Sequence, residues 1–225
     1  MKKICVIGGP SSGKTTATLL LGVCLKMMGY EVHFVLEYAT HYINRNGAPT
    51  NIFEQGFIFQ GQRHEEGYIE RSSKCDFLIC DAASFLACVY TRHFRPSPGA
   101  TENELKKYNY VLKTLDKWAR EQTLPTYDFI FFLPSEIPFQ KNSVRWQNNI
   151  EEAKKIADQI EGYLKVEGRQ YYRITGSLIE RTLQILEILG IFPSEEIKGI
   201  LKILEKIFKE AEEKEKNFKI FPLIE

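Results

Sequence analysis

The sequence lacks the features that would assign it to several large classes of protein. Its 225 residues carry 30 Lys and Arg against 29 Asp and Glu, so its formal net charge of +1 favours neither nucleic acid nor an acidic membrane as a partner. Lys2 and Lys3 precede an apolar run too short for a signal peptide, and no run is long enough to span a bilayer. We find no internal repeat and no low-complexity segment. We therefore expect a cytoplasmic protein with no membrane partner.

The cysteines exclude two further kinds of site. Their number, five, is odd and no two form a Cys-x-x-Cys pair, so neither a disulfide framework nor a zinc site is indicated. Most lie in apolar runs, which favours buried, reduced thiols in a cytosolic protein. The five are Cys5, Cys24, Cys75, Cys80 and Cys88.

One short glycine-rich segment is the most informative part of the chain. Residues 8–15 read Gly-Gly-Pro-Ser-Ser-Gly-Lys-Thr, which fits the phosphate-binding loop (P-loop), a glycine, four residues and Gly-Lys-Ser/Thr. An apolar run at residues 4–7 precedes the loop, and a helical pattern at residues 16–28 follows it and is closed by Gly29. In this order of strand, loop and helix, backbone N–H groups and a helix N-terminus converge on phosphate oxygens.

The loop therefore predicts a site for ATP and Mg²⁺. Lys14 is expected to reach the β- and γ-phosphates, and the Thr15 hydroxyl is expected to hold Mg²⁺. The other residues expected to surround the nucleotide's phosphates are Gly8, Gly9, Pro10, Ser11, Ser12, Gly13 and Thr16.

Strand and helix patterns alternate along the first 190 residues. Further strands are expected at residues 31–36, 77–80, 129–133 and 171–174, and helices at 38–46, 53–73, 84–93, 102–121, 150–164 and 178–189. The alternation predicts an α/β protein with the P-loop NTPase fold, in which helices cover both faces of a five-stranded parallel sheet. In such a sheet, ligands bind at the carboxyl ends of the strands.

The chain is expected to divide near residue 190. Residues 1–190 form the P-loop domain, and residues 191–225 form a C-terminal helical extension. An amphipathic helix is predicted at residues 194–216, which either docks on the domain or forms the contact of a homodimer. Its apolar stripe consists of Ile197, Ile200, Leu201, Leu204, Ile207 and Phe208.

Two carboxylates follow expected strands. Asp81 ends the third strand, where P-loop proteins place the acid that supports Mg²⁺, directly or through water. Glu37 ends the second strand, where a carboxylate can face the γ-phosphate and take the proton from an acceptor hydroxyl. Each can instead cap the helix that follows it.

Arg145 lies in a polar segment at residues 135–149, which we interpret as a flap after the fourth strand. A guanidinium that closes over the transferred phosphoryl group stabilises the charge that develops in the transition state. The alternative is an ordinary surface arginine.

Several other residues are weaker candidates. Arg45 and Arg63 are candidates for contacts to an acceptor, although each can be a surface charge. Gln60 and Gln62 can hydrogen-bond an acceptor base or sugar, or can simply be solvated. Gly176, after the fifth strand, can let the backbone approach an adenine ring, or can belong to an ordinary strand-to-helix turn.

The P-loop, the Glu37-Tyr38-Ala39 run, the strand end at Asp81 and the flap arginine together resemble the nicotinamide-riboside-kinase-like ATPase/kinase family. That family includes the kinase domain of bacterial NAD-metabolism regulators, and phage and bacterial AAA-type ATP-binding proteins. The likeness runs from Lys2 to Leu189. It implies a nucleoside- or nucleotide-kinase-like phosphotransferase that uses ATP and Mg²⁺ and acts on a nucleoside-like acceptor, such as nicotinamide riboside or a deoxynucleotide.

The resemblance also assigns roles to residues. Lys14 and Thr15 become ligands of ATP and Mg²⁺, Asp81 a site carboxylate, and Glu37 a second acidic group near the acceptor. The family's flap usually carries an Asp-Gly-x-Arg run, whereas residues 140–145 here read Gln-Lys-Asn-Ser-Val-Arg, with no Asp and no Gly. This departure leaves the identity of the acceptor open.

Two alternative functions are weighed against this one. A phage-type kinase acting on a modified base in DNA would need a basic face, so nucleic acid is not favoured as a partner. An NTP-hydrolysing switch or assembly ATPase would keep a hydrolytic Glu after Asp81, where this chain has Ala82 and Ala83. The only signs of a basic face are Arg92, His93, Arg95, Lys106 and Lys107.

Overall fold

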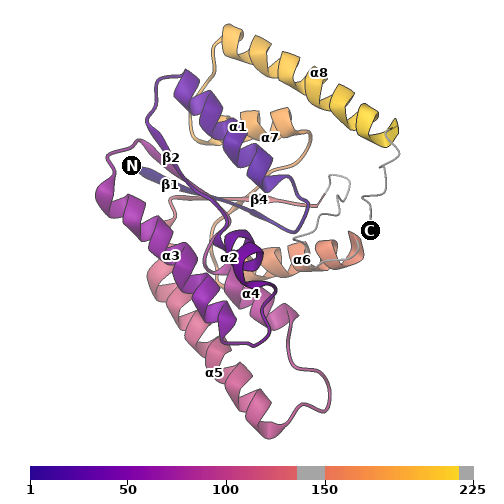
Figure 1. The fold of residues 1–225 in the computed structure, drawn as a ribbon. Coiled ribbons are helices and arrows are strands. Elements are labelled where there is room, and N and C mark those ends of the chain that lie inside the picture. The colour runs from indigo at the N-terminus through magenta and orange to yellow at the C-terminus, as the bar shows by residue number, and fades with distance from the viewer. Residues whose placement is uncertain (136–149, 218–225) are drawn as a thin grey trace.

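The structure, a computed structural model, describes residues 1–135 and 150–217 (Figure 1). Five parallel strands form one sheet in the order β2-β3-β1-β4-β5. The strands are β1 (Lys2–Gly8), β2 (Val32–Val35), β3 (Phe77–Asp81), β4 (Phe129–Leu133) and β5 (Tyr172–Arg173). The predicted five-stranded parallel sheet is therefore confirmed.

Helices cover both faces of the sheet, as predicted (Figure 1). One face packs against α1 (Lys14–Met27) and α7 (Leu178–Ile188), and α8 (Glu195–Asn217) packs on α7 in the same apolar cluster. The other packs against α3 (Glu54–Ser72), α4 (Leu86–His93), α5 (Glu102–Trp118) and α6 (Ile150–Val166). The short α2 (Tyr38–Asn46) follows β2 and contacts α3. Among the described residues, no helix is long and apolar enough to cross a membrane.

Two elements differ from the sequence-based expectation. The helix expected to reach residue 121 ends as an α-helix at Trp118, and a π-helical turn (Ala119–Thr123) and a 3₁₀ turn (Leu124–Thr126) follow it. Pro125 lies in the second turn, and a proline cannot donate the backbone hydrogen bond that continues an α-helix. The fifth strand is short because only Tyr172 and Arg173 pair with β4, at the edge of the sheet.

The C-terminal helix α8 joins the core through its first half. Ile197 and Leu201 are buried in the same apolar cluster as α1 and α7, and Leu204 packs against that cluster. The other residues of its predicted stripe, Ile200, Ile207 and Phe208, are exposed by 37% or more. Ile203, which the predicted stripe did not include, is exposed as well. One side of the helix therefore contacts the domain while further apolar surface faces solvent.

A buried charge joins β1 to α3. Lys3 is 2% exposed, and its Nζ donates to Glu66 Oε2 at 2.7 Å and to Glu70 Oε1 at 2.6 Å. Glu66 is fully buried and also accepts the Tyr127 hydroxyl at 2.9 Å. Burial lowers the pKa of Lys3, but the carboxylate of Glu66 outweighs it, so the pKa lies above its ordinary value. The ammonium group is therefore charged at neutral pH and compensates a carboxylate that has no access to water.

We predict that Lys3→Met lowers the free energy of unfolding by about 3–5 kcal/mol, because it leaves a buried carboxylate without its partner. The neighbouring Lys2 has an exposed side chain, so Lys2→Met should change stability by less than about 0.5 kcal/mol and serves as the control. Urea denaturation of both variants measures the difference. Equal unfolding midpoints would show that the buried pair contributes nothing.

Candidate active site

The P-loop connects the end of β1 at Gly8 to the start of α1 at Lys14. Gly13 has a φ of 78°, a left-handed conformation that suits glycine at the entry of a helix. A Cβ added to Gly8 would collide with the carbonyl oxygen of Leu133 and with the Ser12 side chain. The two glycines therefore let the loop turn tightly against the end of β4.

A buried arginine of α7 supports the P-loop. Arg181, on α7, is fully buried, and its guanidinium donates to the carbonyl oxygen of Ser12 at 2.6 Å and to that of Pro134 at 3.4 Å. It thereby joins the P-loop to the residue after β4. The sequence analysis did not identify Arg181. The usable signal was its position one turn before Ile185, which places a charged residue on the buried face of the helix.

Four predicted residues meet where β1, β2 and β3 end. Lys14 Nζ lies 3.4 Å from Glu37 Oε2, and the Thr15 hydroxyl donates to Asp81 Oδ2 at 2.5 Å. The sheet order explains the meeting, because β3 is the neighbour of both β1 and β2. The structure thus brings Lys14, Thr15, Glu37 and Asp81 into one site.

The electrostatics of this site depend on burial and on one positive charge. Burial lowers the pKa of Lys14, but the carboxylates of Glu37 and Asp81 outweigh it, and the pKa is raised above its ordinary value. Burial raises the pKa of Asp81, and the Lys14 ammonium offsets part of that effect. Lys14 is therefore protonated at neutral pH, ready to neutralise an anion.

Asp81 keeps one carboxylate oxygen available for a ligand. Its Oδ1 is buried and has no hydrogen-bond partner among the described residues, while Oδ2 accepts from Thr15. The next residue, Ala82, has a φ of 80°, a conformation that costs a non-glycine residue about 1–2 kcal/mol. A carboxylate and a hydroxyl are hard oxygen ligands of the kind that Mg²⁺ takes beside a substrate's phosphates, so the residues present fit this ion. Within residues 1–135 and 150–217, no three His, Cys, Asp or Glu side chains cluster as a separate metal site.

A cavity of about 400 Å³ opens beside these residues and extends between α2, α3 and α4; we call it the acceptor cavity. Lys14, Thr15 and Glu37 line its P-loop end. Its walls are largely apolar and include Ile43, Pro49, Ile58, Leu86, Tyr90 and Phe94.

Two glutamines of α3 line the acceptor cavity, Gln55 and Gln62. Gln62 Oε1 accepts the backbone N–H of Tyr38 at 2.8 Å, which leaves its buried Nε2 without a partner among the described residues. The Ser84 hydroxyl, also buried in the cavity wall, has no partner there either. The cavity therefore offers a planar amide donor and a hydroxyl to a polar ligand.

Other predicted residues lie elsewhere. Arg45 and Gln60 are exposed, and Arg63 pairs with Glu70 at 3.1 Å; within the described ranges, none of these three lines the acceptor cavity. Of the two glutamines that line the acceptor cavity, the sequence analysis named Gln62 as a candidate and did not name Gln55. Their spacing of seven residues, with Ile58 between them, places them on one buried stripe of α3, which is the signal that separates Gln62 from Gln60.

The remaining loop candidates do not all lie at the acceptor cavity. Pro10 and Ser11 line the acceptor cavity, and Ser11 has a φ of 59°. Gly176 has a φ of 94° and precedes Ser177, which caps α7 together with Glu180. Arg145 lies outside the described residues.

Comparisons with known proteins bear on the family and the fold of the chain. A family model described as an AAA domain matches residues 3–181. No curated protein sequence matches the chain significantly.

Two kinds of solved structure share the fold. Deoxyadenosine kinase from M. mycoides, with dCMP and dCDP bound, superposes with a TM-score of 0.57 at 13% identity and covers 84% of this chain and 98% of its own. NadR in complex with NR superposes with a TM-score of 0.68 at 16% identity, covering 86% of this chain. NadR with NAD and AMP-PNP gives a TM-score of 0.60 at 15% identity.

The chain spans about half of the NadR chain, 53% in the complex with NR and 51% in that with NAD and AMP-PNP. At these identities the likeness establishes the fold, which is that of nucleoside-kinase-like P-loop proteins. The family resemblance drawn from the loop and the Glu-Tyr pair is confirmed. Since the family model covers most of the chain, from residue 3 to residue 181, the protein belongs to this family of AAA-domain proteins.

Proposed function

We propose that the protein is an ATP-dependent kinase that transfers the γ-phosphoryl group to a hydroxyl of a nucleoside-like acceptor. One observation carries the proposal: a single cavity has Lys14, Thr15 and Glu37 at its P-loop end and two glutamines farther along its length. The solved neighbours support it, since their titles name a deoxyadenosine kinase and an NR complex. We place this activity in residues 1–190, with residues 191–225 as a helical extension.

The donor side of the reaction rests on the P-loop. The protonated Lys14 would neutralise charge on the β- and γ-phosphates, and backbone N–H groups of the loop would bind their oxygens. When bound, Mg²⁺ would be held by Thr15 and Asp81, and would neutralise phosphate charge. Arg181 keeps the loop in place by binding the Ser12 carbonyl oxygen.

The acceptor side requires a proton acceptor, and Glu37 is our candidate. Glu37 stands at the N-cap position of α2, yet its side chain makes no capping hydrogen bond to the helix backbone. Its Oε2 instead accepts the Thr40 hydroxyl at 2.8 Å and faces Lys14 at 3.4 Å. The carboxylate therefore faces the cavity, which favours a catalytic role for Glu37 over a role in capping α2.

In the proposed transfer, one bond to the γ-phosphorus forms and one breaks. The acceptor's hydroxyl oxygen bonds to the γ-phosphorus, the bond from that phosphorus to the β–γ bridging oxygen breaks, and the oxygen leaves on ADP. The hydroxyl proton passes to Glu37. The apolar walls of the cavity exclude water from the reacting groups, which favours transfer over hydrolysis. The two alanines after Asp81 also leave no carboxylate there to activate water.

Glu37→Gln should lower the single-turnover rate of phosphoryl transfer by about 10²–10⁴-fold, the usual span for loss of a general base. ATP affinity should barely change, because Glu37 acts on the acceptor hydroxyl rather than on the nucleotide. Equilibrium ATP titration and rapid-quench transfer measure the two quantities. Glu65→Gln, an exposed change on α3, is the control, and transfer by Glu37→Gln at the wild-type rate would reduce Glu37 to a structural role.

Gln62→Met should raise the acceptor KM by about twofold to tenfold through loss of the Nε2 donor, with ATP affinity little changed. The variant also loses the oxygen that accepts the Tyr38 N–H, which should lower the free energy of unfolding by about 1–3 kcal/mol. Gln60→Met, on the same helix but exposed, should leave the acceptor KM unchanged. Steady-state kinetics at saturating ATP, with thermal unfolding of each variant as a check on folding, make the comparison. Equal KM values for the two variants would remove Gln62 from the acceptor site.

A further inference from the structure

A second hollow adjoins the acceptor cavity; we call it the outer cavity. It has a volume of about 750 Å³, and four residues line both cavities: Pro49, Gln55, Tyr90 and Phe94. Within the described residues its lining includes none from the P-loop. The outer cavity therefore continues the acceptor side of the site and is not part of the ATP site.

The walls of the outer cavity suit a planar ring. Phe53, Tyr90, Phe94 and Tyr108 line it, and Pro96 and Pro98 lie in the loop that closes one side. Aromatic faces of this kind stack on nucleobases and contribute binding energy with little dependence on base identity.

The part of the outer cavity wall formed by Thr50 and Asn51 is held by one carboxylate. Glu54 Oε1 accepts the backbone N–H and the hydroxyl of Thr50, at 3.0 and 2.9 Å, and the Asn51 side-chain amide at 2.7 Å. Its Oε2 accepts the Tyr42 hydroxyl at 3.0 Å. The cavity wall at residues 50–51 is thus fixed before a ligand arrives.

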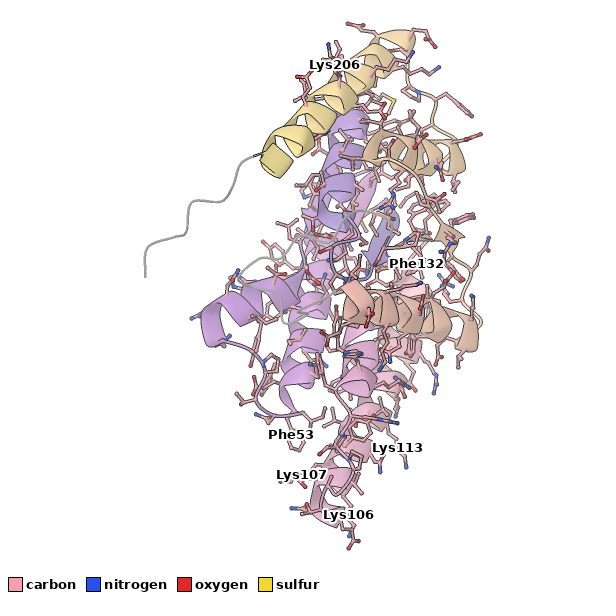
Figure 2. All side chains as sticks on the ribbon, turned by 90° about the vertical axis from the view of Figure 1, so that its right-hand side faces the viewer. Phe53, Lys106, Lys107, Lys113, Phe132 and Lys206 are labelled. Atoms are coloured by element: carbon pink, nitrogen blue, oxygen red, sulfur yellow. The ribbon has the colours of Figure 1, made fainter. Side chains whose placement is uncertain are left out.

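Two side chains of opposite charge line the outer cavity, and they differ in the partners that they already have. Lys107 and Glu104 both line it, but Glu104 is engaged in the capping box of α5, accepting the backbone N–H of Thr101 at 2.7 Å and its hydroxyl at 2.8 Å. Lys107 forms no ion pair with any residue that the structure describes. Figure 2 shows it at the end of α5, beside Lys106. Lys106 pairs with Glu102 at 2.7 Å instead.

We infer that the acceptor is larger than one nucleoside: its reacting nucleoside occupies the acceptor cavity, and a second nucleoside, joined through a phosphodiester, occupies the outer cavity. A cavity of about 400 Å³ lies in the size range that holds one small ligand, and the adjoining hollow of about 750 Å³ has room for a second nucleoside. The second base stacks on Tyr108 and its aromatic neighbours, and Lys107 neutralises the phosphodiester. This inference rests on the proposed kinase function and extends its substrate class.

The test compares 5′-hydroxyl dinucleoside monophosphates with the corresponding nucleosides, deoxyribose and ribose forms alike, as acceptors and as ligands measured by calorimetry. The wild-type protein should bind the dinucleoside at least about fivefold more tightly, the lower end of what one stacked base contributes. Tyr108→Ala should remove most of that preference, and Lys107→Met should reduce it about twofold to fivefold. Neither change should affect nucleoside binding.

Two matched controls lie on the same helix. Tyr110 is 67% exposed and does not line the outer cavity, and Lys106 is paired with Glu102, so Tyr110→Ala and Lys106→Met should keep the dinucleoside preference. If nucleosides are bound and phosphorylated as well as dinucleosides, or if all four variants behave alike, the inference is wrong while the proposed function stands. If neither kind of ligand is bound or phosphorylated, the proposed function and the inference fail together.

Discussion

The site depends on one partly buried positive charge, that of Lys14, which lies beside two carboxylates. Lys14 leaves the P-loop at the end of β1, while Glu37 and Asp81 come from the ends of β2 and β3. Two acids so near each other would repel, and burial already raises the pKa of Asp81, so the Lys14 ammonium is what allows them to share a site. Because β3 lies between β1 and β2 in the parallel sheet, the three strand ends lie side by side.

Helix α3 links the stability of the fold to the shape of the acceptor cavity. Glu66 is fixed by Lys3 and Tyr127 in the interior, and Gln62, one turn earlier on the same helix, faces the cavity. Because the two residues are four positions apart, the buried ion pair and the amide lie on the same face of this helix. On the other side of the sheet, Arg181 links the interior to the site in a similar way. Its guanidinium donates to the Ser12 carbonyl oxygen and so stabilises the conformation of the P-loop.

The sequence predicted the parts of this arrangement that are local. The strand β4 was expected at residues 129–133 and lies at Phe129–Leu133, because an apolar run between polar residues is a local pattern. The P-loop residues could be identified because their order follows from the phosphate they bind. The contact between Arg181 and Ser12 joins residues 169 positions apart, which periodicity does not reveal. The choice between Gln60 and Gln62 likewise depended on which face of α3 is buried.

The most direct test of the account is the fate of the γ-phosphate of labelled ATP, with and without nucleosides and dinucleoside monophosphates, for the wild type and Lys14→Ala. The account predicts slow release of inorganic phosphate by the wild type alone, and acceptor-dependent appearance of a phosphorylated nucleoside product. Lys14→Ala should do neither while remaining folded, since its side chain contacts the site rather than the core. Rapid ATP hydrolysis that no acceptor alters, or transfer that persists without Lys14, would contradict the account.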